Sequence, residues 1–535
     1  MRRWLRATRQ TNRKPRKEKV MPNNQTFSQT LSIANTLETF GIVQPDIESK
    51  HLVNDSRQVT EGDVFCAVIG SASDGRQFID KAISLGASLV IAQCHHQQQH
   101  GNRIKRQVTL ESGEERTVDI VQFYQLDTEL YALASTYYGK PQSAMSLIGV
   151  TGTNGKTSTT QFIASLLTDC QRKAAVIGTT GAGTLDNLIP IANTTPGPTE
   201  LNQIMASFAA QHIDHIAMEV SSHALEQQRI TAEQLSVAVF TNLSRDHLDY
   251  HETMAAYAEA KFAIFSGQST QVAVVNGDDE VAQQWLNDKR ITQPTIVYGV
   301  GESVCQYPRF VQASDITLSV SGIEFTVTTE SSKARVGTRL LGKFNVENLL
   351  AAIGALLALD IPLEAIAQAI PEVKPSQGRM ETFSAADKAL AVVDYAHTPD
   401  ALENAITACR HHCEGELWVV FGCGGDRDKG KRSEMGKIAE TTADHVVITN
   451  DNPRTEAPEL IANDILSGCN KPEKITVILD RAQAVKSTLA HAKANDVVLL
   501  AGKGHENTIE IAGEITEYSE RALVKALYMA EDAND

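Results

Sequence analysis

The sequence predicts an α/β protein that is built on parallel sheets and divided into three domains. Short apolar runs typical of buried strands alternate with helical stretches along most of the chain. This alternation favours parallel sheets that helices cover on both faces. A glycine-rich segment lies directly between one such run and a helical stretch. The length of 535 residues gives room for roughly three or four domains.

Composition and charge exclude several classes of protein. The chain is 42% hydrophobic and 21% charged, which is ordinary for a globular protein. Apolar runs stay shorter than the roughly 18 residues that a membrane span needs, so we expect no membrane segment. The net charge of −16 argues against nucleic acid as a general partner. The eight cysteines are scattered, which favours the reducing cytoplasm, and we expect a monomer.

The first residues differ from the rest of the chain. Residues 1–20 hold nine Lys or Arg and one Glu, and they lack the apolar core of a secretory signal. We interpret residues 1–22 as a disordered basic extension and favour a translation start at Met21. An Arg-rich transit peptide and a nucleic-acid-binding arm are the alternatives.

Residues 23–140 are predicted to form a first, smaller α/β domain. Its expected strands are apolar runs separated by a helical stretch, at residues 63–70, 88–92 and 118–121. Polar segments at residues 55–57 and 71–76 lie beside these runs. Such segments are suited to hydrogen-bonding a ligand.

Residues 141–375 are predicted to form the central domain, which holds the main parallel sheet. Beyond the glycine-rich segment, further strands are expected at residues 174–177, 215–220, 237–240, 272–275 and 296–298. Helical stretches lie between most of these runs. Residues 316–320 and 323–327 flank Ser321-Gly322, which indicates an antiparallel hairpin added to the sheet.

Residues 376–535 are predicted to form a third, Rossmann-like α/β domain. Its strands are expected at residues 390–393, 417–421, 446–448, 475–478 and 497–500. Several of them end directly in polar loops, at residues 394–397, 422–427, 450–454 and 502–506. Ligands of open α/β sheets bind outside the carboxyl ends of the strands. These loops therefore indicate a second binding surface.

The segment Thr151-Gly152-Thr153-Asn154-Gly155-Lys156-Thr157-Ser158 follows an apolar run and leads into a helical stretch. This is the context of a phosphate-binding loop. Glycines let backbone N–H groups converge on phosphate oxygens, and the helix N-terminus adds partial positive charge. Lys156 can reach the outer phosphates, and the Thr157 hydroxyl suits Mg²⁺. Val150 stands where the common loop has glycine, so this is a variant loop that points to a narrower family.

Glu219 and His247 are candidates for the metal side of this site. Glu219 ends an apolar run of the same sheet, where a carboxylate can hold Mg²⁺ directly or through water. The alternative is a solvated acid at a strand end. His247 and His251 have the spacing of a zinc pair, but Leu248 stands where a metalloprotease needs Glu. We interpret His247 as a hydrogen-bonding or metal-side residue near the phosphates.

Two further features have plain structural explanations. Lys261 lies in an amphipathic stretch, residues 255–265, and the pattern alone favours a solvated helix residue. The segments Cys94-His95-His96 and Cys409-Arg410-His411-His412-Cys413 combine metal-binding residue types. Neither has the paired Cys-x-x-Cys spacing of a zinc site, so we expect no zinc at either.

The phosphate loop, Glu219-Val220-Ser221-Ser222-His223 and Asp246-His247 together resemble the Mur ligase family, and the resemblance covers nearly the whole chain from about residue 25. These are ATP-dependent enzymes that form amide bonds in peptidoglycan synthesis. The resemblance implies a central domain that binds ATP. The implied ATP contacts are Gly152, Thr153, Asn154, Gly155, Lys156, Thr157, Ser158, Asn345, Asn348, Arg379 and Asp394.

The resemblance also implies the catalytic and metal-binding residues. Lys156, Glu219, His247 and Lys261 are the implied catalytic residues, and Thr157, Glu219, His247 and Lys261 the implied Mg²⁺ ligands. The interpretation of Lys261 is thereby reversed, because a lysine in this context takes up CO₂ as a carbamate and becomes N6-carboxylysine. The resulting anion can ligate Mg²⁺ beside the γ-phosphate.

The first domain and parts of the central domain resemble the family's binding site for its nucleotide-sugar substrate, here UDP-MurNAc-L-Ala-D-Glu. The implied contacts are Asn54, Ser56, Ser71, Ala72, Ser73, Asn193, Thr194, Thr195, Ser221, Gln227 and Arg229.

Asp451-Asn452-Pro453-Arg454 resembles the version of a motif in family members that add meso-diaminopimelate, whereas lysine-adding relatives lack this Arg. An Arg fork can bind the second carboxylate of diaminopimelate bidentately, and lysine would leave the Arg without a partner. The implied diaminopimelate contacts are Arg427, Asp451, Asn452, Pro453, Arg454, Gly502 and Glu506. Glu506 would pair with the distal ammonium.

The resemblance therefore implies a ligase that adds meso-diaminopimelate to UDP-MurNAc-L-Ala-D-Glu through an acyl phosphate. A lysine-adding Mur ligase and a folylpolyglutamate-type ligase are alternatives within the class. A P-loop protein that only hydrolyses nucleotide is an alternative from another class, but it would need no Arg and Glu in the third domain.

Overall fold

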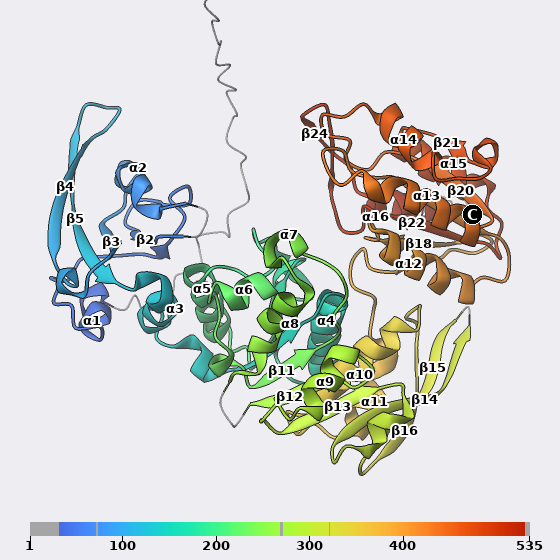
Figure 1. The fold of residues 1–535 in the computed structure, drawn as a ribbon, viewed down its shortest axis with the longest axis horizontal. Coiled ribbons are helices and arrows are strands. Elements are labelled where there is room, and N and C mark those ends of the chain that lie inside the picture. The colour runs from blue at the N-terminus through green and yellow to red at the C-terminus, as the bar shows by residue number, and fades with distance from the viewer. Residues whose placement is uncertain (1–31, 71–72, 268–270, 320, 530–535) are drawn as a thin grey trace, which may run out of the picture.

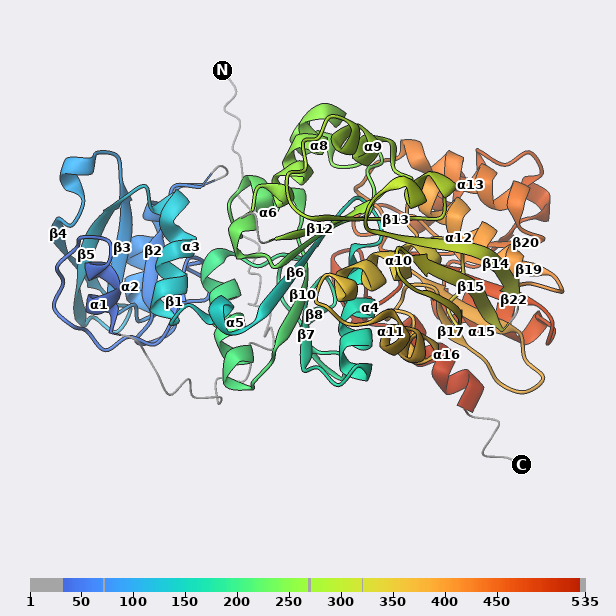
Figure 2. The same cartoon turned by 90° about the horizontal axis from the view of Figure 1, so that it is seen from below.

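The structure, a computed structural model, describes residues 32–70, 73–267, 271–319 and 321–529. The basic extension, Ser71 and Ala72 lie outside these residues. Three parts, each built around its own sheet, follow one another from one end of the molecule to the other (Figure 1). The view at right angles shows the same order (Figure 2). The predicted three-part α/β organisation is confirmed, while the exact boundaries at residues 140 and 375 stay predictions.

The first part is a mainly parallel sheet with helices beside it. Its strands are β1 (Leu52–Val53), β2 (Val64–Ala67), β3 (Leu89–Cys94), β4 (Arg103–Thr109) and β5 (Glu115–Tyr124), and its helices are α1 (Ile33–Glu38), α2 (Ile79–Leu85) and α3 (Leu126–Tyr137). The order is β1-β2-β3-β5-β4, with only β4 antiparallel to its neighbour. The three predicted strands are confirmed. β4 was not predicted, because this edge strand is almost wholly exposed and rich in Arg and Lys.

Within the described residues, the central sheet has eleven strands in the order β16-β15-β14-β13-β12-β11-β6-β10-β7-β8-β9. The strands are β6 (Ser146–Thr151), β7 (Ala174–Gly178), β8 (Gly181–Thr184), β9 (Asn187–Ile189), β10 (His215–Glu219), β11 (Val237–Phe240), β12 (Val272–Asn276), β13 (Thr295–Gly299), β14 (Phe310–Ser319), β15 (Gly322–Thr329) and β16 (Lys333–Thr338). The helices are α4 (Lys156–Asp169), α5 (Pro198–Ala210), α6 (Ser222–Glu226), α7 (Leu248–His251), α8 (Met254–Phe262), α9 (Glu280–Asn287), α10 (Phe344–Leu357) and α11 (Leu363–Ala369).

The middle of this sheet is parallel and buried on both faces. Along β6, Leu147 packs into one core with α5, whereas Ile148 and Val150 pack into the other core with α4 and α10. An apolar run without alternation therefore predicted the strand correctly. The other expected strands and the antiparallel β14–β15 hairpin are also confirmed, although Val320 lies outside the described residues. β8 and β9 at one end of the sheet and β16 at the other end were not predicted.

The third part is a parallel sheet in the order β17-β18-β22-β19-β20-β21, with β17 antiparallel at one edge. Its strands are β17 (Glu381–Phe383), β18 (Leu390–Asp394), β19 (Leu417–Phe421), β20 (His445–Ile448), β21 (Thr476–Val477) and β22 (Val497–Ala501), followed by a separate hairpin of β23 (Thr508–Ile511) and β24 (Glu514–Glu517). Its helices are α12 (Pro399–His411), α13 (Gly430–Thr442), α14 (Pro458–Leu466), α15 (Arg481–His491) and α16 (Glu520–Met529). The five predicted strands are confirmed. In the part of the chain that is described, no helix has both the length and the apolar character to cross a membrane.

The central and third parts meet at a buried histidine. His412 follows α12 and is 1% exposed. Its Nε2 accepts the N–H of Gly342 at 3.1 Å, so Nδ1 must carry the proton that is donated to the carbonyl of Ser319. Leu341, beside Gly342, is buried in the apolar core of the third part. One neutral imidazole thus joins the end of α12 to the last residue of β14 and to the loop before α10.

Acid should weaken this joint. Burial lowers the pKa of His412, and the charge of His411 acts in the same direction against the opposing Ser319 carbonyl. The unfolded chain therefore takes up this proton more readily than the folded protein. The stabilisation from His412 is present above the ordinary histidine pKa of about 6.5 and is lost as pH falls below it.

We expect the thermal unfolding midpoint of the wild type to decrease when the pH is lowered from 7.5 to 5.5. His412→Ala should lower the midpoint at pH 7.5 but make the midpoint depend less on pH. Calorimetry of both proteins measures this. His491→Ala removes an exposed histidine of α15 and serves as the control. Equal pH dependence in wild type and His412→Ala would show that this ring does not govern the joint.

Candidate active site

The glycine-rich loop closes tightly on its neighbours. It connects β6 to α4, and Gly152 and Gly155 both have positive φ angles, 154° and 84°. A Cβ on Gly152 would overlap the Thr241 hydroxyl, and one on Gly155 would overlap the Asn348 side chain. Both positions thus require glycine for conformation and for space. The loop backbone is held between the end of β11 and the first turns of α10.

Two lysines converge on one carbonyl of this loop. Lys156 Nζ donates to Gly152 O at 2.8 Å and to Thr153 O at 2.9 Å. Lys261 Nζ reaches the same Gly152 O at 2.8 Å and is 1% exposed. The pattern-based interpretation of Lys261 as a solvated residue is therefore wrong, because α8 turns this face toward the loop. Burial, and then the charge of Lys156, lower the pKa of Lys261 well below its ordinary value.

Glu219 lies buried at the end of β10, 1% exposed. Its Oε1 accepts the Thr157 hydroxyl at 3.0 Å and the Thr179 N–H at 2.8 Å, and its Oε2 accepts the Thr179 hydroxyl at 3.2 Å. These donors are neutral, and a buried carboxylate is costly without a compensating charge. A hydroxyl and a carboxylate in contact are oxygen donors of the kind that Mg²⁺ prefers. The pair Thr157 and Glu219 therefore fits the predicted metal.

His247 and Lys261 meet at another side chain, Tyr257. Lys261 Nζ lies 4.5 Å from the centre of the Tyr257 ring, and the His247 ring packs edge-on against it at 6.1 Å. The Tyr257 hydroxyl lies 3.3 Å from that of Thr153 in the loop. The predicted metal ligands thus form two pairs, and each pair adjoins the loop. In the described ranges, no three His, Cys, Asp or Glu side chains group as a metal site on their own.

The second histidine of the zinc-like spacing, His251, has different surroundings. His251 is buried, with Nε2 2.9 Å from Ser222 Oγ and Nδ1 3.3 Å from Glu226. A structural role for His251 therefore accounts for the His247–His251 spacing without zinc.

Tyr257 was not singled out from the sequence, although it lies four residues before Lys261 and therefore on the same helix face.

The predicted nucleotide contacts outside the loop come from α10 and from the segment entering the third part. Asn348 accepts the Thr159 hydroxyl of α4 at 3.4 Å and donates to Asn345 at 3.1 Å. The Arg379 guanidinium lies 4.8 Å from the centre of the Tyr395 ring. Burial lowers the pKa of Lys156, and the charge of Arg379 acts in the same direction, whereas the charges of Glu219 and Asp246 oppose it. Arg379 therefore lies within electrostatic reach of the phosphate loop.

Asp394 is the last residue of β18, and its side chain binds backbone N–H groups. It accepts the N–H groups of Met380 at 2.7 Å and Ala396 at 2.8 Å. Burial raises its pKa despite the nearby Arg379. The carboxylate thereby fixes the strand end against the segment that carries Arg379.

The residues predicted to bind the peptide portion of the nucleotide-sugar substrate lie beside Glu219. Thr195 donates to Glu219 O at 2.9 Å and accepts the Ser221 N–H at 3.1 Å. Arg229 donates to Thr195 O at 3.0 Å and to Gln227 Oε1 at 2.7 Å. These residues form one network at the carboxyl end of β10.

The remaining sugar-nucleotide predictions are more dispersed. Thr194 Oγ1 lies 3.1 Å from Thr179 Oγ1. Asn54 accepts the Thr199 hydroxyl at 2.9 Å, which links the first part to α5. Ser56 is buried, whereas Ser73 and Asn193 are exposed.

The loops predicted to bind an amino acid are neighbours, because their strands are. The order β22-β19-β20 brings the carboxyl ends of these strands side by side. Arg454 Nη1 donates to Gly425 O at 2.8 Å. A Cβ on Gly424 would lie 3.0 Å from Arg454 Nη1 and 3.7 Å from Arg427 Cγ. Both guanidinium-bearing side chains therefore flank one glycine.

The third loop adds a carboxylate to this group. Asn452 Nδ2 donates to Glu506 Oε2 at 3.0 Å. A Cβ on Gly502 would lie 3.3 Å from Asp451 Oδ2, and Pro453 leads directly into Arg454. All seven residues predicted to bind diaminopimelate are thus brought to one edge of the sheet.

Two buried arginines bind the backbone of these loops. Arg432 is 0% exposed and donates to Gly424 O at 3.1 Å, to both oxygens of Glu456 at 3.0 Å and to Asp464 at 2.9 Å. Arg481 donates to Asn450 O at 3.0 Å and to Ala501 O at 2.8 Å, and it pairs with Glu520. The backbones that carry the site are therefore fixed by charged hydrogen bonds.

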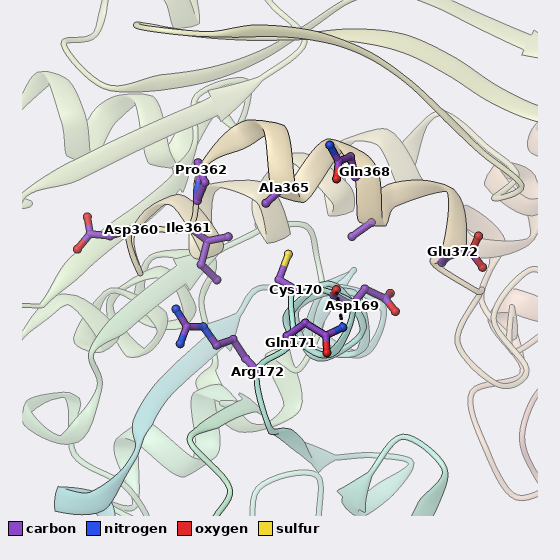
Figure 3. A pocket seen from close by; sticks show the side chains of 11 residues that line it. Asp169, Cys170, Gln171, Arg172, Asp360, Ile361, Pro362, Ala365, Gln368 and Glu372 are labelled. Atoms are coloured by element: carbon purple, nitrogen blue, oxygen red, sulfur yellow. Dashed lines mark hydrogen bonds between the residues drawn. The ribbon is translucent and has the colours of Figure 1, made fainter.

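A cavity of about 510 Å³ lies elsewhere, at the far end of α4. Figure 3 shows Cys170 and Arg172 on one side of it and the segment from Asp360 to Glu372 on the other. α4 has 14 residues, so this cavity is about 20 Å from the phosphate loop. Its lining shares no residue with the predicted sites.

Known proteins match this chain along most of its length. Three family descriptions match: "Mur ligase family, catalytic domain" at residues 49–138, "Mur ligase middle domain" at 150–356 and "Mur ligase, glutamate ligase domain" at 378–504. The UDP-N-acetylmuramoyl-L-alanyl-D-glutamate--2,6-diaminopimelate ligase of Vibrio vulnificus is 46% identical over 485 residues, which cover 90% of this chain and 95% of the relative.

Solved structures agree with these matches. One titled as a UDP-N-acetylmuramoyl-L-alanyl-D-glutamate--2,6-diaminopimelate ligase has a TM-score of 0.65 and 33% identity, and it covers 94% of this chain and 100% of its own. The MurF ligase of Thermotoga maritima, solved in complex with ADP, has a TM-score of 0.60 at 19% identity, covering 92% of this chain and 100% of its own. This second likeness shows the fold alone. The chain belongs to the Mur ligase family of ATP-dependent, amide-forming ligases.

Proposed function

We propose that this chain joins meso-diaminopimelate to the D-Glu γ-carboxylate of UDP-MurNAc-L-Ala-D-Glu, while ATP becomes ADP and phosphate. The observation that carries the proposal is the convergence of Arg427, Arg454, Asn452 and Glu506 at one sheet edge. The names of the relatives support it, since the 46% identical protein and the 33% identical structure are both called diaminopimelate ligases.

The charges at that edge suit diaminopimelate better than lysine. The far end of diaminopimelate carries a carboxylate and an ammonium, whereas the far end of lysine carries only an ammonium. Arg454 offers a guanidinium fork for the carboxylate, and Glu506 offers a carboxylate for the ammonium. Lysine brings no second carboxylate for the Arg454 fork, and the Glu510 carboxylate lies 3.8 Å from Arg454 Nε, too far for a direct hydrogen bond. Binding lysine would therefore lose a charge-assisted interaction that diaminopimelate makes.

In the first half-reaction, an oxygen of the γ-carboxylate attacks the γ-phosphorus of ATP. The bond from that phosphorus to the bridging oxygen breaks, ADP leaves, and an acyl phosphate forms. Lys156 and the N–H groups of residues 152–157 would neutralise charge on the transferred group. Thr157, Glu219, His247 and Lys261 would hold Mg²⁺, which supplies further charge neutralisation at the phosphates.

In the second half-reaction, the amine of diaminopimelate attacks the acyl carbon. The carbon–oxygen bond to phosphate breaks, the amine loses a proton, and an amide remains. Arg454 and Glu506 would orient the amine from the third part, so the three parts must close around the intermediate. Closure would also exclude the water that hydrolyses an acyl phosphate.

We further propose that Lys261 acts as its carbamate. Its burial against the Gly152 carbonyl and the Tyr257 ring supports this, because a carbamate there would add a second anionic oxygen ligand to the carboxylate of Glu219. We also propose that the protein works in the cytoplasm as a monomer.

The function is tested by phosphate release from ATP. Release should require both UDP-MurNAc-L-Ala-D-Glu and meso-diaminopimelate. Arg454→Ala should raise the KM for diaminopimelate by about 30-fold or more, because loss of a buried charged partner costs about 2 kcal/mol or more. The KM for ATP should stay within about twofold.

Two variants control this experiment. Arg454→Lys keeps the charge without the guanidinium fork, and its affinity for diaminopimelate should remain well below that of the wild type. Arg410→Ala removes an arginine that pairs with Asp444 at 2.8 Å, near the opposite ends of the strands, and should change neither KM. Equal losses of affinity for ATP and diaminopimelate in Arg454→Ala would contradict the assignment.

The carbamate is tested by carbon NMR of protein equilibrated with ¹³C-bicarbonate. Wild type should show a carbamate carbon resonance that Lys261→Met lacks, and activity should fall in CO₂-free buffer and return with bicarbonate. Lys388→Met, which removes an ammonium bonded to Leu527 O, should keep the resonance. A liganded, Mg²⁺-bound crystal with a plain ammonium at Lys261 would count against the carbamate.

A further inference from the structure

Lys503 is a buried cation to which the reaction above gives no role. It follows β22 in the loop Gly502–Glu506, and its side chain is 0% exposed. Burying an ammonium is costly unless it is fully paired. Its partners therefore indicate what the protein uses this charge for.

All three protons of the ammonium are used. Lys503 Nζ donates to Asn452 Oδ1 at 2.9 Å, to Glu506 Oε2 at 2.8 Å and to Thr508 O at 2.8 Å. Asp451 Oδ1 lies 3.5 Å away. Three of these four partners are side chains of the proposed diaminopimelate site, and they come from two different loops.

These bonds fix the direction of the Asn452 amide. Asn452 Oδ1 accepts from Lys503 and from the Glu510 N–H at 3.0 Å, so Nδ2 must be the group that donates to Glu506. Glu506 Oε2 thus receives two donors from the protein. Its Oε1 lies 3.4 Å from the Tyr395 hydroxyl, a long contact that leaves this oxygen able to accept a substrate ammonium.

The charge also balances the two carboxylates. Asp451 and Glu506 both lie against Lys503. Burial pushes the pKa of Glu506 upward, but the hydrogen bond and charge of Lys503, together with Asn452, bring it below its ordinary value. Without Lys503 the site would be one unit more negative.

We propose that Lys503 is a positioning and specificity residue for the incoming amino acid. It holds Asn452 and Glu506 in the orientation that binds the distal ammonium, and it cancels one carboxylate charge so that a dicarboxylic diamine is favoured over the more cationic lysine. This inference rests on the proposed function.

A merely structural role makes a different prediction. Lys503 also ties the start of β23 through Thr508 O, and loss of that bond alone would lower stability without changing which amine is used. The experiment must therefore compare substrates rather than total activity.

Lys503→Met replaces the ammonium with an unbranched apolar side chain, and Lys503→Gln keeps a donor without the charge. In both variants we expect the KM for diaminopimelate to rise by about tenfold or more, with the KM for ATP and for UDP-MurNAc-L-Ala-D-Glu within about twofold. The ratio of kcat/KM for diaminopimelate to that for lysine should fall by about tenfold. The acid limb of the pH–rate profile should move to higher pH, because Glu506 loses the cation that favours its ionised form.

A double variant tests whether Lys503 acts through Glu506. If it does, the fold-loss of kcat/KM for diaminopimelate in the double variant Lys503→Met with Glu506→Gln should be smaller than the product of the fold-losses in the two single variants. Lys388→Met, at the amino end of β18 in the same part, is the matched control and should leave all three KM values and the substrate ratio unchanged. If Lys503→Met does not fold, as judged by its thermal unfolding, Lys503→Gln decides the question.

Two results would overturn the inference while the proposed function stands. One is an active wild type whose Lys503 variants keep its preference for diaminopimelate and lose only thermal stability. The other is a parallel rise in all three KM values. A wild type that forms no amide with diaminopimelate would overturn the proposed function and this inference together.

Discussion

The site must gather positive charge in a chain whose net charge is −16. The proposed substrates are a triphosphate, a sugar diphosphate with a carboxylate, and a dicarboxylic amino acid, so all of them bring negative charge. The protein meets this constraint locally rather than by its overall field. Lys156 lies against the phosphate loop, and Arg427 and Arg454 flank one glycine of the third part.

These cations are held in different ways. At the phosphate loop, the ammonium of Lys156 is bound by the backbone carbonyls of Gly152 and Thr153, which are neutral acceptors that a phosphate can replace. In the third part, exposed Arg427 and half-buried Arg454 lie on loops that buried Arg432 and Arg481 fix to the sheet. Breaking one partner of such a buried pair costs several kcal/mol. The amino-acid site is therefore built as a rigid surface, whereas the phosphate loop is arranged to exchange its partners.

The parallel strands and their polar loops could be predicted from the sequence, because buried strands are continuous apolar runs and polar loops follow them directly. Sequence reasoning missed β4 and β16, which are short or exposed edge strands that tertiary pairing stabilises against weak local patterns. It placed Lys261 in solvent from its helical pattern, because amphipathic spacing shows which residues share a face but does not show what covers that face. Tyr257 and Lys503 were missed because a residue that supports others leaves no motif of its own. The roles of the candidate residues came from the resemblance, and what the fold adds is their proximity.

The central claim is that a guanidinium in the third part selects the amine. The most direct measurement gives purified protein, ATP and UDP-MurNAc-L-Ala-D-Glu an equimolar mixture of meso-diaminopimelate, lysine and ornithine, and determines the amide products by mass spectrometry. The account predicts almost exclusively the diaminopimelate product. Lysine product in comparable amount would contradict it.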